Sequence, residues 1–260
     1  MCIRDRPKNI TALGSDAFNG CNNLQYVDMT DSRDLAVDEF SRESGVFAGV
    51  PARTLVYMPQ GNTQQFNDVN VVNTSDIAEQ SDDATVATAR CADYQLEDRI
   101  TVDVPRKFRA EKVEQGRVFN PGVKSTVFLP FGMSAEQTAA LGKFYEFESF
   151  DNEANEVTFT RVESTRANTA YLFIPDGTGF NTTEVNVNVS RESDPNEVCF
   201  IGTYHNMKIE SNPWAYGYVG TPTEGFELGQ FVKVKEGASV PSMRAYLQLC
   251  LLYTSPSPRD

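Results

Sequence analysis

Residues 17–29 read AFNGCNNLQYVDM, and residues 46–58 read VFAGVPARTLVYM. The two stretches align without a gap at an offset of 29 residues. An internal repeat of this length is typical of solenoid proteins, in which each unit buries its apolar side chains against the next one. The sequence therefore predicts a short stack of repeated units. Four residue types recur at matching places: Phe18 and Phe47, Gly20 and Gly49, Val27 and Val56, and Met29 and Met58.

Within one unit, the apolar residues are spaced as the inward anchors of a solenoid, and polar residues fill the intervals. The alternation in Tyr26–Met29 predicts a short strand with one buried face. A charged insertion, Asp31–Ser44, separates the two units. We therefore interpret residues 7–63 as the terminal repeats, or cap, of a longer array.

The repeat resembles a known family. ITALGSDAFNGCNNLQYVDM (residues 10–29) is similar to the BspA-type leucine-rich repeat of Bacteroidales surface proteins, and VFAGVPARTLVYMPQGNT (46–63) resembles the segment that follows such repeats. Residues 91–113, 125–132 and 231–249 resemble the same proteins. The resemblance implies a leucine-rich-repeat solenoid cap on a secreted or outer cell-surface protein. Such a protein would act in adhesion, without catalysis or a cofactor, on a protein or glycan ligand.

The two ends of the chain are expected to be foreign to it. Residues 1–6 read MCIRDR, and residues 250–260 read CLLYTSPSPRD. One DNA word read on opposite strands could encode both peptides, as expected of a sequencing adapter translated together with its insert. Such segments are set aside before the fold is considered. We therefore expect a fragment whose earlier repeats are missing.

The remainder of the chain predicts a polar linker followed by an all-β domain. Residues 64–90 are rich in Asn, Asp, Gln, Ser and Thr, which bury little apolar surface. Residues 91–249 contain short alternating or apolar runs separated by turn residues, as in an antiparallel β-sandwich. A helix is expected at Ser134–Leu141, with Ser134 and Gln137 at capping-box positions. The strands are expected at 68–72, 99–104, 125–131, 143–150, 156–162, 169–174, 184–189, 198–204, 226–235 and 243–249.

Composition excludes several classes of partner. The formal net charge is −13, so the chain should repel the phosphates of nucleic acids. No apolar run is long enough to span a membrane. Outside the ends, three widely spaced cysteines predict neither a disulfide framework nor a metal site, but small buried side chains. They are Cys21, Cys91 and Cys199.

Catalytic chemistry finds little support in the sequence. His205 is the single histidine; it follows an apolar run and is expected at a strand end or on the surface rather than as a catalytic base. Acidic pairs could serve a glycoside hydrolase, but the carboxylates are abundant and form no signature. We interpret 151–156 and 192–197 as hairpin turns rather than calcium loops. The carboxylates weighed are Glu146, Glu148, Glu163 and Glu184.

One aromatic strip offers an alternative function. Trp214, Tyr216 and Tyr218 alternate in the sequence, so in an extended strand all three side chains point to the same side. Such a platform can stack on sugar rings, or it can cover part of a β-domain core. A carbohydrate-binding module is therefore the alternative to a protein-binding surface protein.

Overall fold

The computed structural model describes residues 10–249 except for 33, 36–44, 52, 60, 63–65, 67–68, 75–88, 152, 195–198, 210–214 and 221–224. Both segments expected to be foreign, 1–6 and 250–260, lie outside the described residues. The fold is mainly β, and α2 (Ala135–Leu141) is the single helix within the described ranges. The chain divides into two compact units. Unit 1 comprises 1–118, 130–132 and 179–190; unit 2 comprises 119–129, 133–178 and 191–260.

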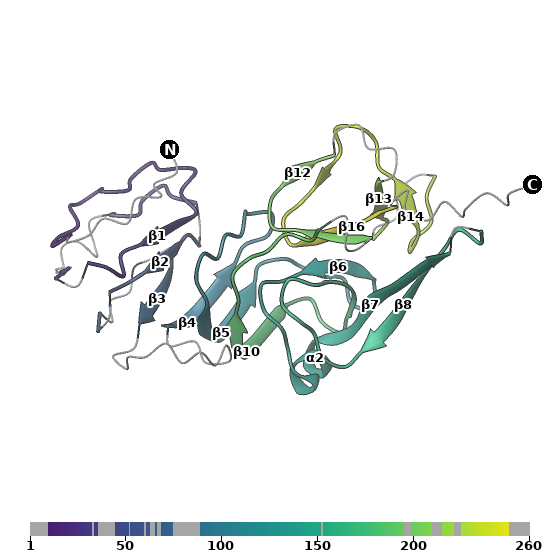
Figure 1. The fold of residues 1–260 in the computed structure, drawn as a ribbon, viewed down its shortest axis with the longest axis horizontal. Helices are drawn as coiled ribbons and strands as arrows, with labels where there is room; N and C mark the ends of the chain where they lie inside the picture. The colour runs from purple at the N-terminus through teal and green to yellow at the C-terminus, as the bar shows by residue number, and fades with distance from the viewer. Residues whose placement is uncertain are drawn as a thin grey trace, which may run out of the picture. The chain divides into compact units, whose positions relative to one another are not determined.

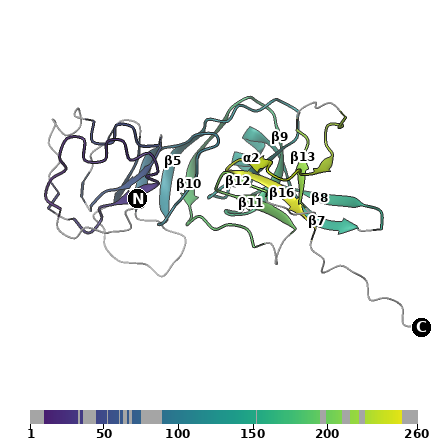
Figure 2. The ribbon, with the colours of Figure 1, turned by 90° about the horizontal axis from the view of Figure 1, so that it is seen from above.

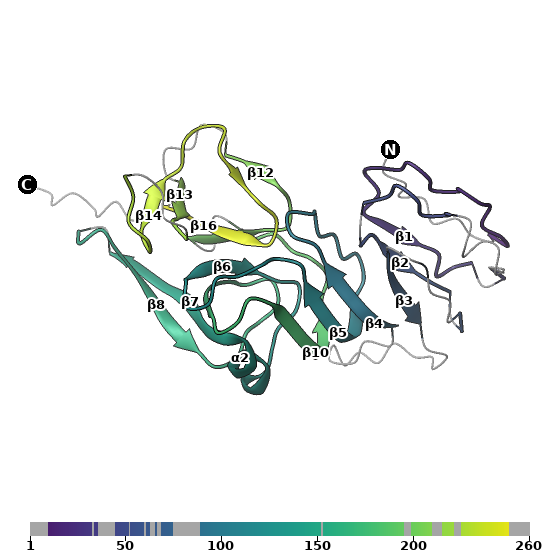
Figure 3. The same cartoon turned by 180° about the vertical axis from the view of Figure 1, so that it is seen from behind.

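Unit 1 is built on one mixed six-stranded sheet, whose strands lie in the order β1-β2-β3-β4-β5-β10 (Figures 1 and 3). The pairs β1–β2, β2–β3 and β4–β5 are parallel, whereas β3–β4 and β5–β10 are antiparallel. The strands are β1 (Tyr26–Asp28), β2 (Leu55–Tyr57), β3 (Asn70–Thr74), β4 (Ala89–Leu96), β5 (Phe108–Gln115) and β10 (Phe180–Val187).

The 29-residue offset in the sequence is also the register in which β1 and β2 pair. Val27 lies opposite Val56 in the parallel ladder. The rings of Phe18 and Phe47 are stacked, with centroids 5.2 Å apart and planes inclined by 1°. Equivalent residues of the two repeats, 17–29 and 46–58, therefore lie directly beside each other.

Backbone hydrogen bonds join the two repeats outside their paired strands as well. The Phe18 N–H donates to the Val46 carbonyl at 2.9 Å, and the Gly20 N–H donates to the Ala48 carbonyl at 3.0 Å. Gly49 has a φ of +70°, and a Cβ there would lie 3.4 Å from the Gly20 nitrogen. Glycine thus suits this position, because it adopts the left-handed conformation without strain and has no Cβ where the two backbones approach closely.

Two apolar layers cover the β1–β3 part of the sheet. On one face the repeat core gathers the side chains that the repeat pattern predicts as inward anchors. On the other face Tyr57 is 1% exposed; its ring packs against that of Phe108, and its hydroxyl donates to the Arg106 carbonyl at 2.9 Å. The repeat core contains Leu13, Leu24, Val27, Met29, Val46, Phe47, Val56, Met58, Phe66, Val69 and Val71.

The strands β4, β5 and β10 share an irregular spacing. In each of them two consecutive residues are exposed between inward-facing ones, at Ala92-Asp93, Glu111-Lys112 and Thr183-Glu184. The interruptions lie beside one another, because Asp93 and Thr183 both pair with Lys112. Glu184 has a φ of 56° within its strand. The expected domain boundary near residue 91 falls inside unit 1, since β4 pairs with both β3 and β5.

Unit 2 contains two four-stranded antiparallel sheets and a two-stranded ribbon. The sheet order is β6-β9-β7-β8 in one and β11-β16-β13-β14 in the other, and β12 pairs with β15. Figure 2 shows β7 and β8 as a long hairpin. The strands are β6 (Ser125–Phe128), β7 (Gly142–Asp151), β8 (Glu156–Val162), β9 (Ala170–Pro175), β11 (Phe200–Thr203), β12 (Met207–Lys208), β13 (Ala215–Tyr218), β14 (Phe231–Lys233), β15 (Ser239–Val240) and β16 (Arg244–Gln248).

The two four-stranded sheets contact each other through side chains. The ring of Phe128 on β6 covers Gly202 on β11, and Phe159 on β8 stacks on Phe231 on β14 with centroids 6.0 Å apart. The opposite face of the β11-containing sheet packs on residues of the β12–β15 ribbon. The apolar cluster between that face and the ribbon contains Ile201, Ile209, Ala215, Val240 and Tyr246.

One local prediction from the sequence, the capping box of α2, agrees with the structure, and another, the strand at 99–104, does not. The capping box of α2 is confirmed, since the Ser134 hydroxyl accepts from the Gln137 N–H and the Gln137 side chain accepts from the Ser134 N–H. The expected strand at 99–104 is wrong. This stretch is a turn followed by an irregular segment, in which Val102 and Val104 are buried without pairing as a strand. Their alternation therefore reflects burial rather than a β-ladder.

Candidate functional site

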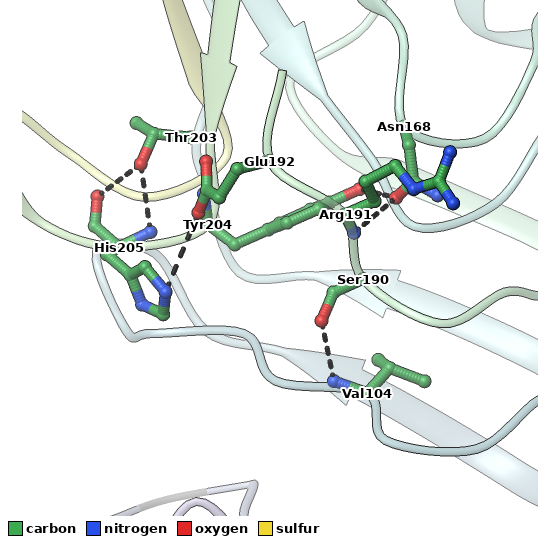
Figure 4. A network of polar contacts seen from close by, with 8 residues as sticks. All are labelled: Val104, Asn168, Ser190, Arg191, Glu192, Thr203, Tyr204 and His205. Carbon is green, nitrogen blue, oxygen red and sulfur yellow. Dashed lines mark hydrogen bonds and ion pairs between the residues drawn. The ribbon is translucent and has the colours of Figure 1, made fainter. Parts of the chain in front are cut away.

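His205 and its neighbours form a polar network at the end of β11 (Figure 4). The Glu192 carboxylate accepts the Tyr204 N–H at 2.8 Å and lies 3.6 Å from His205 Nε2. The His205 and Glu192 side chains are 54% and 42% exposed, so water screens this contact. The prediction that His205 lies at a strand end on the surface is confirmed.

The Thr203 hydroxyl, two residues before this histidine, already has hydrogen-bond partners in the backbone. Thr203 Oγ1 donates to the His205 carbonyl and accepts the His205 N–H, both at 3.1 Å. It therefore contacts the backbone of His205 and not the imidazole. A nucleophile activated by a histidine requires a hydrogen bond to the ring itself.

A buried tyrosine anchors the same region from inside. Tyr204 is 1% exposed, and its hydroxyl donates to Asn168 Oδ1 at 2.7 Å. That oxygen also accepts the Arg191 N–H at 3.3 Å, while the Asn168 N–H donates to the Leu129 carbonyl at 2.8 Å. Asn168 has a φ of 57°, which asparagine tolerates better than most residues. The network thus joins three chain segments of unit 2 and is structural in character.

Figure 4 also draws one contact within unit 1. Ser190 Oγ accepts the Val104 N–H at 3.0 Å. This bond satisfies a backbone donor in the irregular segment that follows residue 99. It explains how Val104 is held in the interior without a strand partner.

Three of the four carboxylates considered for hydrolysis have separate partners. Glu146 pairs with Arg166, Glu148 accepts from the Thr160 hydroxyl, and Glu184 pairs with Arg109. For Glu163 the recorded contact is at its backbone, where the carbonyl accepts from the Thr138 hydroxyl. Such contacts are typical of solvated sheet faces and strand ends.

The first of the two segments weighed as calcium loops, 151–156, is a hairpin turn where the structure describes it. The Asp151 carboxylate accepts the N–H groups of Glu153 and Ala154 at 2.8 and 3.0 Å, which closes the β7–β8 hairpin. The second turn, 192–197, lies partly outside the described residues. Among those described, no group of three His, Cys, Asp or Glu side chains could hold a metal ion.

The aromatic strip is only partly within the described chain, because Trp214 lies outside it. Tyr216 and Tyr218 are half-buried and share one face of β13. Tyr218 lies opposite Phe231, and their rings meet edge to face with centroids 5.2 Å apart. Burial raises the pKa of Tyr218. Since Phe231 stacks on Phe159 of the facing sheet, Tyr218 continues an aromatic cluster between the sheets.

The three cysteines of the described chain differ in burial, and Cys91 is the most deeply buried. Cys91 is 1% exposed, and burial raises the pKa of its thiol to about 12. Cys21 and Cys199 are half-buried, and none of the three forms a disulfide within the described residues. The thiolate is the reactive form, so Cys91 is inert near neutral pH.

The sequence did not reveal one partly buried ion pair in unit 1. Asp28 on β1 receives Arg106 Nε at 2.9 Å, and its side chain is only 8% exposed. The other carboxylate oxygen accepts from the N–H and the hydroxyl of Thr30. No local pattern signals this pair, because its two members are far apart in the chain and each is flanked by ordinary polar residues.

Comparison of the chain with protein-family models, curated proteins and solved structures finds no match. None of the helices in the described ranges is long and apolar enough to cross a membrane.

Proposed function

We propose that the protein is a non-catalytic cell-surface or secreted protein that acts in adhesion or protein interaction, and that residues 7–63 are the leucine-rich-repeat cap of its array. One observation carries the proposal: β1 and β2 pair in parallel at the repeat offset, with Phe18 stacked on Phe47. Stacked units of this kind build extended recognition surfaces. The BspA-type pattern in residues 10–29 supports the assignment to surface proteins.

The contacts of the titratable groups support a role in binding rather than catalysis. His205 faces Glu192 across 3.6 Å on an exposed surface, and the adjacent Thr203 hydroxyl serves the backbone. A catalytic base needs a reacting group within hydrogen-bond reach. Cys91, as a buried thiol with a raised pKa, also lacks the properties of a nucleophile.

The recognition surface is expected on the sheet face opposite the repeat core. On β2 this face is closed, because Tyr57 is covered by Arg106 and Phe108. Leu55, on the same face of β2, is 3% exposed, whereas Tyr26, its equivalent on β1, is half-buried. The face thus becomes more accessible from β2 to β1, so we place the ligand-binding surface toward the N-terminal side of the stack.

Unit 2 would serve as a rigid β-sandwich support. Two four-stranded sheets that contact each other through Phe128, Gly202, Phe159 and Phe231 favour this architecture. The half-buried Tyr216 and Tyr218 keep a glycan-binding module as the alternative. What favours that alternative is their shared face on β13; the packing of Tyr218 on Phe231 favours a core role instead.

Binding of the full chain to immobilised extracellular-matrix proteins and to a glycan array tests the proposal. We expect saturable binding to a protein ligand, weakened by Tyr26→Ala and unchanged by the exposed control Glu114→Ala. Hydrolysis of a glycan or peptide substrate that disappears in His205→Ala, without any such binding, would overturn it.

A further inference from the structure

The two repeated units differ in how deeply equivalent side chains are buried. Phe47 is 4% exposed and lies between Phe18, stacked at 5.2 Å, and Phe66, met edge to face at 5.0 Å. Phe18, its equivalent, is half-buried and in the described part of the chain contacts one ring, that of Phe47. Phe47 of the second repeat therefore has an aromatic neighbour on each side, whereas Phe18 of the first repeat has one among the described residues.

The strands show the same asymmetry. Val56 on β2 is 0% exposed, and Leu55 is 3% exposed. On β1, Val27 is 8% exposed, and Tyr26 is half-buried. Because the positions are equivalent, the difference follows from the number of neighbouring strands. Among the described residues, β2 lies between β1 and β3, whereas β1 is the outer strand of the sheet.

The backbone identifies which groups lie at this outer edge. The Leu55 N–H donates to the Gln25 carbonyl at 3.2 Å, and the Met29 N–H donates to the Tyr57 carbonyl at 2.9 Å. In a parallel ladder alternate residues direct their N–H groups to one neighbour. The N–H of Val27 is thus on the β2 side with that of Met29, and the N–H of Tyr26 is on the outer side. Tyr26 is the repeat equivalent of Leu55, whose N–H crosses to the preceding unit.

We propose that the outer edge of β1, together with the outer side of Phe18, is a docking surface for one more 29-residue unit of the same pattern. The inference rests on the proposed repeat function and specifies the partner of this edge. The incoming unit would place a phenylalanine on Phe18 as Phe18 lies on Phe47. Its strand would accept the Tyr26 N–H, as Gln25 accepts that of Leu55. The incoming repeat would thus pack on the first repeat in the register in which the first repeat packs on the second.

An extended chain tests this docking directly. A copy of residues 17–45 is inserted after position 16 of the full chain, which places a new phenylalanine one repeat ahead of Phe18. Hydrogen exchange of individual backbone amides is measured by NMR. The matched control has the same insertion with Phe18→Asp and Val27→Asp in the inserted copy only.

In the extended chain we expect exchange of the original Tyr26 amide to slow by roughly tenfold or more, as for an amide that enters a sheet. In the control and the parent chain it should stay fast. Rapid exchange of Tyr26 in the extended chain, with Val27 and Met29 still protected, would overturn the docking proposal alone. Loss of protection at Val27 and Met29 in the parent chain would overturn the repeat assignment and the docking proposal together.

Discussion

Gly202 on β11 lies directly beneath the ring of Phe128 on β6, so that a Cβ at this position would come within 2.1 Å of Phe128 Cδ2. No side chain can occupy this place unless the ring moves. Phe128 is 0% exposed and also packs on Tyr204, with ring centroids 4.4 Å apart. The glycine therefore sets how closely the two sheets of unit 2 approach.

Gly202→Ala should destabilise the protein by about 1–3 kcal/mol, because added volume in a packed core forces side chains and backbone to shift. Denaturant unfolding measures the change. Gly177→Ala is the matched control, since nothing lies within 4 Å of its Cβ position. Phe128→Leu should restore part of the loss in the double variant; a strictly additive double variant would contradict the steric explanation.

The Asp28–Arg106 pair gives a second prediction. Asp28→Ala removes the acceptor of Arg106 and of the Thr30 N–H and hydroxyl. We expect a loss of about 1–2 kcal/mol of unfolding free energy, because these hydrogen bonds go to a charged acceptor but water partly screens the exposed Arg106. Glu114→Ala, which breaks an exposed contact with Lys112, should change stability by less than about 0.5 kcal/mol. Equal effects of the two substitutions would show that the burial of Asp28 contributes nothing.

Cys91 predicts a loss of stability at alkaline pH. Its thiol has a pKa of about 12 in the folded protein against 9.0 when unperturbed, because burial disfavours the thiolate. The contribution is complete below pH 9 and is lost as the pH rises toward 12, since only the unfolded chain then releases the proton easily. The slope can reach about 1.4 kcal/mol per pH unit.

Denaturant midpoints at pH 8 and pH 10.5 measure this effect. The decrease between the two should be smaller in Cys91→Ala than in the parent chain. Buried Tyr57 and Tyr94, whose pKa values are also raised by burial, should leave a residual decrease. Iodoacetamide at pH 8 should alkylate Cys21 and Cys199 before Cys91, as located by mass spectrometry; early labelling of Cys91 would refute its burial.

The aromatic strip separates the two candidate functions. Tyr218→Ala should lower stability by about 1–3 kcal/mol, because its ring packs on Phe231. Tyr216→Ala and Trp214→Ala should leave glycan-array profiles unchanged if the protein is not a carbohydrate-binding module. Glycan binding that is lost in either variant, with an unchanged melting temperature, would establish the carbohydrate alternative.

The sequence predicted the elements whose pattern is regular and local. The capping box of α2 needs only Ser134 and Gln137, three residues apart, and β8 was placed at its observed bounds, Glu156–Val162. The 29-residue register of β1 and β2 was readable because chemically similar residues recur at the same spacing.

Other elements followed rules that no single segment reveals. Strand β5 (Phe108–Gln115) was missed because its buried residues Ala110 and Val113 are three apart, which breaks the alternation of a strand. The expected strand at 226–235 is reduced to Phe231–Lys233, since Gly229 turns the chain with a φ of +91°. The expected strand at 184–189 ends at Val187; Val189 lies beyond it and is 43% exposed, whereas Val185 and Val187 are buried.

The candidate site was only partly predictable for the same reason. His205 was correctly placed at the surface from its position after an apolar run. Its partner Glu192 and the Tyr204–Asn168 bond depend on segments brought together by the fold. The Asp28–Arg106 pair likewise results from tertiary packing that local spacing does not encode.

The shared irregularity of β4, β5 and β10 limits how this part of the chain can change in length. Deleting Glu111 would restore strict alternation in β5 but would shift Val113 and Gln115 against their partners on both sides. A compensating deletion in β4 alone would still leave β10 out of step. Single-residue deletions here are therefore tolerated only when all three strands lose a residue together, so unit 1 should accept insertions and deletions in its loops far more readily than along this row.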